Sequence, residues 1–118
     1  MKILLCSATD HNPVNLLPLE SVQINPDIIY VAVSTQKRQQ GDNLIAELKA
    51  IGKKVEVLKI ENEHSLQSLT QQYEQWLLQH QDDEIVVNLT GGTKLMSIAA
   101  YQIFSGYGFR CFYQYLNT

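Results

Sequence analysis

The chain has 118 residues, of which 45% are apolar and 18% are charged, and its formal net charge is −3. We therefore expect one globular domain, residues 1–118, and exclude a membrane protein, because no apolar run approaches the length that a bilayer requires. Proteins that wrap long nucleic acids are usually basic, so the negative charge also excludes that class of partner and favours a small ligand.

The first predicted element is a strand at Lys2–Cys6, a short apolar run with a single lysine. Because this run is too short for a signal peptide, we expect a cytoplasmic protein. A polar loop follows at residues 7–12. Apolar residues between 16 and 22 then predict a short helix that is bent near Pro18.

Two strands and two helices are predicted in the middle of the chain. The clearest strand is Ile28–Val33, an unbroken apolar run of the kind found in central parallel strands. The spacing of apolar residues in Gly41–Ile51 predicts an amphipathic helix. Val55–Ile60 alternates more, which suits a strand at or near the sheet edge. A second amphipathic helix is predicted over His64–His80.

The most informative stretch is Glu84–Tyr101, in which the apolar run Ile85–Val87 predicts a buried strand that turns directly into a helix. A last strand is predicted at Phe109–Tyr115. Strands and helices thus alternate along the whole chain, which implies right-handed crossovers. We predict an α/β fold, a Rossmann-like three-layer sandwich with a mainly parallel sheet of five or six strands.

The turn at residues 90–93, T-G-G-T, has the composition of an anion-binding site. Gly91 and Gly92 let the backbone approach a ligand closely, and N–H groups at the start of the next helix can point at one phosphate. Lys94 is unfavourable at the positive end of the helix dipole unless a bound anion compensates. Close packing is the alternative explanation for the glycines, but it does not account for the threonines and the lysine.

This turn differs from the best-known nucleotide-binding loops. Both the G-x-x-x-x-G-K-[ST] and the G-x-G-x-x-G patterns are absent, which excludes the standard triphosphate and dinucleotide sites. The sequence has no cluster of carboxylates or histidines at metal-ligand spacing, so we expect neither a metal nor another cofactor. Cys6 and Cys111 are isolated and are expected to be small buried groups without a disulfide.

In open parallel sheets a ligand lies beyond the carboxyl ends of the strands, where the strand order reverses, and this usually brings the first and fourth strands together. The loops that follow these strands would line one site, and the end of the second strand would form its rim. The candidate ligand-binding residues are Ala8, Thr9, Asp10, His11, Asn12, Ser34, Thr35, Gln36, Asn88, Thr90, Gly91, Gly92 and Thr93.

Several of these residues have an ordinary structural explanation as well. Ser7 is predicted to lie opposite Lys94, and we assign both a catalytic role, although a serine at a strand end is often only a turn residue. His11 is a general acid or base only if it faces the site. Asn12 is equally explained as a turn residue. Asn88, in a buried strand, either braces the neighbouring loops or contacts ligand.

The segments VVNLTGGTKLMSIAA and SATDHNPVNLLP together resemble the CRISPR-associated Rossmann fold (CARF) domains, and in particular the sensory domains of nucleases activated by cyclic oligoadenylate. The resemblance covers essentially the whole chain. It implies a homodimer that holds one cyclic oligoadenylate, with cyclic tetra-adenylate as the expected ring, across its two-fold axis. Residues 90–94 would then grip phosphate and ribose, and residues 7–12 the rest of the ring.

CARF sensors are normally fused to an effector domain, and we find no nuclease motif in this sequence. A stand-alone binder of this family resembles the ring nucleases, which cleave cyclic oligoadenylate without a metal. Ring cleavage is therefore the predicted activity. Two alternatives stay open, namely a non-catalytic sensor or sponge, including an excised sensor domain, and an enzyme that uses a mononucleotide or a sugar phosphate.

Overall fold

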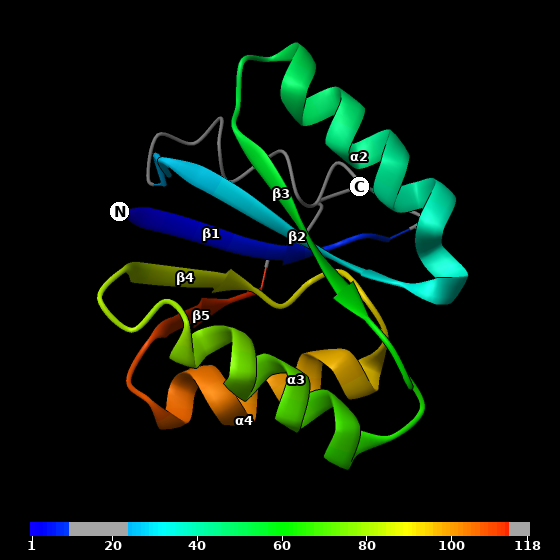
Figure 1. The fold of residues 1–118 in the computed structure, drawn as a ribbon, viewed down its shortest axis with the longest axis vertical. Coiled ribbons are helices and arrows are strands. Elements are labelled where there is room, and N and C mark those ends of the chain that lie inside the picture. Colours follow the sequence, from blue (N-terminus) through cyan, green and yellow to red (C-terminus); the bar gives the residue numbers. More distant parts are fainter. Residues whose placement is uncertain (10–23, 114–118) are drawn as a thin grey trace.

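The computed structural model describes residues 1–9 and 24–113 (Figure 1). Its elements are, in chain order, β1 (Lys2–Ser7), β2 (Ile28–Ser34), the 3₁₀ helix η1 (Thr35–Lys37), α2 (Arg38–Ala50), β3 (Val55–Ile60), α3 (Leu66–Leu78), β4 (Glu84–Asn88), α4 (Lys94–Gly106) and β5 (Arg110–Phe112). The short helix predicted between residues 16 and 22 lies outside the described residues.

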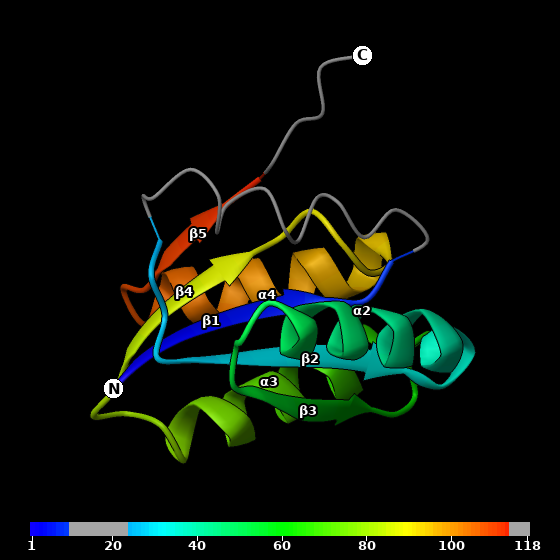
Figure 2. The same cartoon turned by 90° about the horizontal axis from the view of Figure 1, so that it is seen from above.

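The five strands form one sheet in the order β3-β2-β1-β4-β5, and every neighbouring pair is parallel. Figure 2 shows this order from the α2 side. Helix α2 covers one face of the sheet, whereas α3 and α4 cover the other (Figure 1). The predicted three-layer α/β fold is confirmed, and β3 is an edge strand as its alternating pattern indicated.

Three predicted boundaries differ from the structure. Helix α2 begins at Arg38 and not at Gly41. Gly41 instead lies inside the helix, where a Cβ atom would be 2.7 Å from the methyl groups of Val33 on β2, so this glycine allows helix and sheet to approach. Helix α3 is shorter than predicted because Ser65 caps it, accepting a hydrogen bond from the N–H of Ser68. The last strand is Arg110–Phe112, and the described residues Phe109 and Tyr113, which were predicted to belong to it, lie outside it.

Two apolar layers hold the helices onto the sheet. Ile3 and Leu5 of β1 point toward α3 and α4, and Leu4 and Cys6 point toward α2, as strand alternation requires. Burial raises the pKa of the Cys6 thiol to about 12. Cys6 and Cys111 are both free thiols, but Cys111 is only partly buried, so the prediction that both are buried is wrong for Cys111. No helix within residues 1–9 and 24–113 is long and apolar enough to cross a bilayer.

Aromatic rings fill the space between α3 and α4. Phe104 of α4 is fully buried and packs edge-on against Tyr73, at a ring-centroid distance of 5.9 Å, and against Trp76, at 5.8 Å. Such pairs contribute beyond the apolar area they bury. Phe104 is therefore the contact that joins the two helices of this layer.

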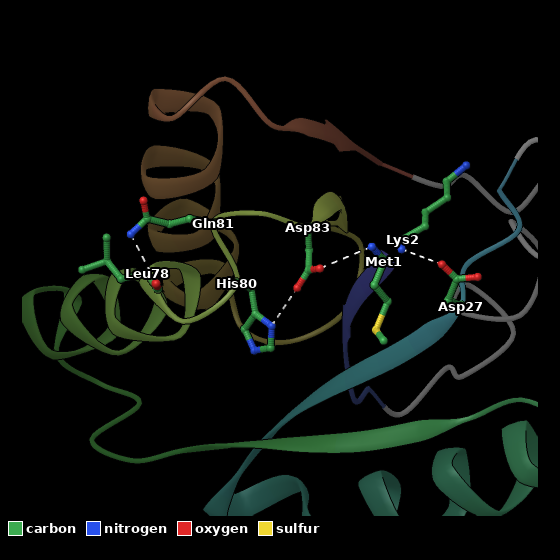
Figure 3. A network of polar contacts seen from close by, with 7 residues as sticks. All are labelled: Met1, Lys2, Asp27, Leu78, His80, Gln81 and Asp83. Atoms are coloured by element: carbon green, nitrogen blue, oxygen red, sulfur yellow. Dashed lines mark hydrogen bonds and ion pairs between the residues drawn. The ribbon is translucent and has the colours of Figure 1, made fainter.

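The amino ends of β1 and β4 are tied together by polar contacts (Figure 3). Asp83 lies 3.4 Å from the amino group of Met1 and 3.3 Å from Nδ1 of His80. The N–H of Lys2 donates to the carboxylate of Asp27 at 2.7 Å. These contacts explain Asp83 and His80 as structural residues at the end of the sheet opposite to the predicted site.

Replacing Phe104 by alanine tests the role of the aromatic layer. Loss of a fully buried ring together with its two aromatic contacts should lower the free energy of unfolding by about 3–5 kcal/mol. Urea denaturation measures this change. Tyr101→Ala, an exposed position on the same helix, is the control and should change stability by less than about 1 kcal/mol. Equal losses in the two variants would contradict the assignment.

Candidate functional site

The carboxyl ends of β1 and β4 lie side by side, because the two strands pair directly, with Leu5 opposite Val87. The loop that follows β4 therefore starts next to the end of β1 (Figure 2). This juxtaposition of the first and fourth strands is the one that we expected from the order of elements.

The two glycines of the turn are packed against Ser7. A Cβ atom at Gly91 would overlap the carbonyl oxygen of Ser7, and at Gly92 it would lie 3.1 Å from the Ser7 Cβ atom. Gly92 also has a φ of +81°, a conformation that side chains disfavour. Close packing, the alternative that the sequence left open, is thus a real requirement at both positions.

Three side chains hold the turn in place. The amide oxygen of Asn88, which is 1% exposed, accepts a hydrogen bond from the N–H of Thr90 at 3.0 Å. The hydroxyl of Thr93 accepts from the N–H of Met96 at 3.1 Å and so caps α4. Ser97 donates to the carbonyl oxygen of Leu89 at 2.8 Å. Asn88 therefore braces the turn, one of the two roles considered for it, and Ser97 is a supporting residue that the sequence analysis missed.

The turn offers a run of backbone donors. Within the described part of the chain, the N–H groups of residues 91–95 donate to no acceptor, whereas those of Thr90, Met96 and Ser97 are bonded. Lys94 is exposed and makes no ion pair with any described residue. Consecutive N–H groups, a helix N-terminus and a nearby ammonium are the elements of an anion-binding site.

Ser7 lies beneath this turn. It is 9% exposed, and strand alternation places its side chain on the face of Ile3 and Leu5, toward α3. Its neighbour there is Tyr73, whose pKa is raised by burial and lowered in part by the Ser7 side chain. The catalytic role predicted for Ser7 stays a prediction, and its low exposure makes a supporting role the simpler one in this structure.

The other residues predicted after β1 are placed differently. Ala8 is 2% exposed and packs in the α2 layer, and its N–H donates to the carbonyl oxygen of Ala32 at 3.0 Å. Only its carbonyl group remains for contact with a ligand. Thr9 lies beside Gly91, since its Cβ atom is 3.5 Å from the position of a Gly91 Cβ. The predicted ligand residues Asp10, His11 and Asn12 lie outside the described residues.

The residues predicted to form the rim lie at another hollow. Ser34 and Thr35 line a depression of about 320 Å³ between α2 and β3, together with Val33, Arg38, Asp42, Ile45, Val57, Lys59 and Glu61. Gln36 is exposed and lies 3.5 Å from His64, measured between side-chain nitrogens. No residue of the turn lines this hollow. Its carboxylates, Asp42 and Glu61, are matched in number by the cations Arg38 and Lys59, so the hollow has no excess positive charge, and we place the anion site at the turn, where Lys94 stands beside a run of unbonded N–H groups.

Metal ligands are not grouped in the described residues. Within residues 1–9 and 24–113, no set of three or more histidine, cysteine, aspartate and glutamate side chains lies close enough together to hold a metal ion. The groups gathered at the turn are amides, hydroxyls and one ammonium. Their chemistry suits an oxyanion better than a divalent cation.

The sequence matches one family model, described as the Card1 CARF domain, over residues 14–118. No curated protein matches the chain. Among solved structures, Can2 from Sulfobacillus thermosulfidooxidans in complex with cyclic tetra-adenylate superposes with a TM-score of 0.81 and 17% identity, over 96% of this chain and 32% of Can2. The fold is therefore shared at low sequence identity.

Two further solved structures agree. The protein VC1899 from Vibrio cholerae gives a TM-score of 0.80 at 17% identity, over 94% of this chain and 30% of VC1899. Enterococcus italicus Csm6 bound to cyclic hexa-2'-fluoro-hexa-dAMP gives 0.77 at 21% identity, over 100% of this chain and 34% of Csm6. The chain thus spans about a third of the length of each of these proteins.

Replacing Gly91 by alanine tests the packing of the turn on β1. The added methyl group would overlap the Ser7 carbonyl oxygen, so we expect the free energy of unfolding to fall by about 1–3 kcal/mol. Gly106→Ala is the matched control, because a Cβ atom there meets nothing within 4 Å. It should be neutral or stabilising by up to about 1 kcal/mol. Chemical denaturation of both variants gives the comparison, and an unchanged Gly91→Ala protein would show that the turn can move away from β1.

Proposed function

Since the chain belongs to the Card1 CARF domain family, we propose that it binds a cyclic oligoadenylate at the turn between β4 and α4. The observation that carries this proposal is the run of N–H groups at residues 91–95, which have no acceptor among the described residues and lie beside the exposed Lys94. A phosphodiester supplies the negative charge that this turn lacks.

A cyclic oligonucleotide suits a site that consists of a single turn in each chain. One turn offers donors for one phosphate, whereas a ring carries several phosphates on a closed backbone. Two copies of the chain related by a two-fold axis would present two equivalent turns to one symmetrical ring, so we propose a homodimer with a shared site. Can2 was solved with cyclic tetra-adenylate, and Csm6 with a cyclic analogue of six nucleotides. We propose cyclic tetra-adenylate, the ring of four nucleotides, as the ligand of this chain.

We further propose that the protein cleaves this ring as a metal-independent ring nuclease. A ribose 2'-oxygen attacks the adjacent phosphorus, a new P–O2' bond forms and the P–O5' bond breaks. The products are a 2',3'-cyclic phosphate end and a 5'-hydroxyl end, and the 2'-hydroxyl proton ends on the leaving 5'-oxygen. In this proposal Lys94 and the N–H groups of Gly91 and Gly92 stabilise the charge on the phosphorane, and Ser7, which lies beneath the turn, supports the backbone that presents these groups to the reacting ribose and phosphate.

A non-catalytic sensor is the second candidate. It is favoured by the length of the related proteins, because this chain corresponds to only 32% of Can2 and 34% of Csm6. A sensor or sponge needs the same turn and the same ligand but no cleavage. The two candidates therefore differ in the fate of the bound ring and not in its recognition.

Lys94→Ala tests the binding site. A charge-assisted contact with phosphate contributes about 1.5–3 kcal/mol, so the variant should bind cyclic tetra-adenylate roughly 10–100-fold more weakly in a calorimetric titration. The wild-type titration should end at one ring per two chains, and AMP should not reproduce it. Lys59→Ala, which changes a lysine of the hollow beside β3, is the control and should bind normally. If Lys59→Ala loses affinity and Lys94→Ala does not, the turn is not the site.

Radiolabelled cyclic tetra-adenylate tests the cleavage proposal. Incubation with excess protein and EDTA should yield linear fragments with 2',3'-cyclic phosphate ends, because the nucleophile belongs to the substrate and no metal takes part. A ring with 2'-O-methyl groups should bind but stay intact. If the unmodified ring co-migrates with the protein and is recovered whole, ring cleavage is refuted and the sensor or sponge remains.

A further inference from the structure

The outer edge of β3 is open to another strand. β3 pairs with β2 on one side, and no described residue pairs with its other side (Figure 2). The carbonyl oxygen of Lys54 accepts a hydrogen bond from the N–H of Ile29, and in a parallel ladder alternate residues turn their N–H and C=O groups to the same neighbour. Val55, Val57 and Lys59 therefore turn these groups outward, where they form a template for a further strand.

Val57 lies in the middle of this edge. Its side chain is 51% exposed and lines the hollow between α2 and β3. The residue beside it on β2, Val31, is fully buried. Open edges are usually protected by proline, a bulge or a charge that points inward. An exposed β-branched residue at the centre of the strand instead favours pairing with another chain.

The sequence around Val57 is complementary to itself when two copies run antiparallel. In the register that places Val57 opposite Val57 of the second copy, Val55 of each copy lies opposite Lys59 of the other, and all these residues turn their backbone groups outward. Lys53 of each copy then lies opposite Glu61 of the other. Neither Lys53 nor Glu61 makes an ion pair with any described residue. Two pairs of opposite charges would thus flank an apolar centre, and such cross-strand pairs are favourable.

We propose that the outer edge of β3 is an interface with a second copy of this chain, in which the two β3 strands pair antiparallel about Val57. The two five-stranded sheets then form one continuous sheet. A second copy is the partner that the charges favour, because Lys53 and Glu61 are placed reciprocally about Val57. The turn at residues 90–93 is not part of this interface, since β2 and β1 lie between β3 and β4.

Val57→Lys tests the centre of the interface. Ligand-free wild-type protein should self-associate over a concentration series in sedimentation velocity. The variant should do so at least about tenfold more weakly, because two ammonium groups then meet at the two-fold axis. Leu78→Lys makes the same kind of change at an apolar residue of α3 that is 48% exposed, and it should associate like the wild type. A monomeric wild type, or equal association of wild type and Val57→Lys, would overturn the inference.

Charge reversal tests the register. Lys53→Glu places two carboxylates opposite each other, and Glu61→Lys places two ammonium groups there, so each variant should associate about three- to tenfold more weakly. The double variant has opposite charges again and should associate like the wild type. A change that only damaged folding would not be rescued in this way. Losses that add in the double variant, or single variants without effect, would contradict pairing about Val57.

Cyclic tetra-adenylate separates this interface from the proposed ligand site, and only this last test rests on the proposed function. The proposed ring joins two chains at the turn, so chains that also pair through β3 should form assemblies larger than a dimer when the ring is added. Val57→Lys with the ring should stop at a dimer, and larger assemblies of this variant would contradict the role of β3. If the ring does not bind in the calorimetric titration, the ligand proposal fails, while the ligand-free comparison still decides on β3.

Discussion

The contact between Gly91 and the carbonyl oxygen of Ser7 is the constraint on which the site depends. It exists because β1 and β4 pair directly although they are far apart in the chain. Only a residue without a side chain allows the turn after β4 to lie on the end of β1. Once the turn is there, α4 starts at the carboxyl edge of the sheet, and its first N–H groups face the side where loops and ligands gather. The packing of Gly91 on Ser7 thus determines where the N–H groups of the proposed ligand site lie.

The polar groups at the two ends of the sheet differ in whether they have partners within the described chain. At the amino end, the contacts of Asp83 with His80 and Met1 tie together the start of β1 and the turn before β4 (Figure 3). At the carboxyl end, the N–H groups of residues 91–95 have no acceptor in the described chain. Polar groups that the fold itself does not satisfy are costly unless another partner binds them. This run of unbonded donors beside Lys94 is a physical reason to expect an anionic ligand there.

Much of the fold follows from local patterns in the sequence, and much of the site does not. The β-branched run of β2 predicted a central strand, because a strand buried on both faces is apolar throughout. The alternation of β3 predicted an edge strand, because a strand buried on one face alternates apolar and polar residues. The apolar spacing predicts a helix that starts at Gly41, but this glycine lies inside α2, where it permits close contact with Val33. Ser97 could not be recognised as a support of the turn, because its hydrogen bond to Leu89 forms only once α4 has packed beside the end of β4. Ser34 and Thr35 are predicted at the rim of the same site, and the structure places them in the lining of a hollow between α2 and β3 that contains no residue of the turn.

The packing and the ligand explanations of the two glycines are not alternatives. The glycines that let the backbone pass close to Ser7 also carry no side chain that would stand between their N–H groups and a ligand, so the same residues can serve both purposes. The glycines alone therefore cannot discriminate between a structural turn and a binding site. Lys94 can, because packing gives no reason for an exposed ammonium in the first turn of α4, where the helix dipole opposes it. The case for an anionic ligand rests on this cation and on the donors beside it.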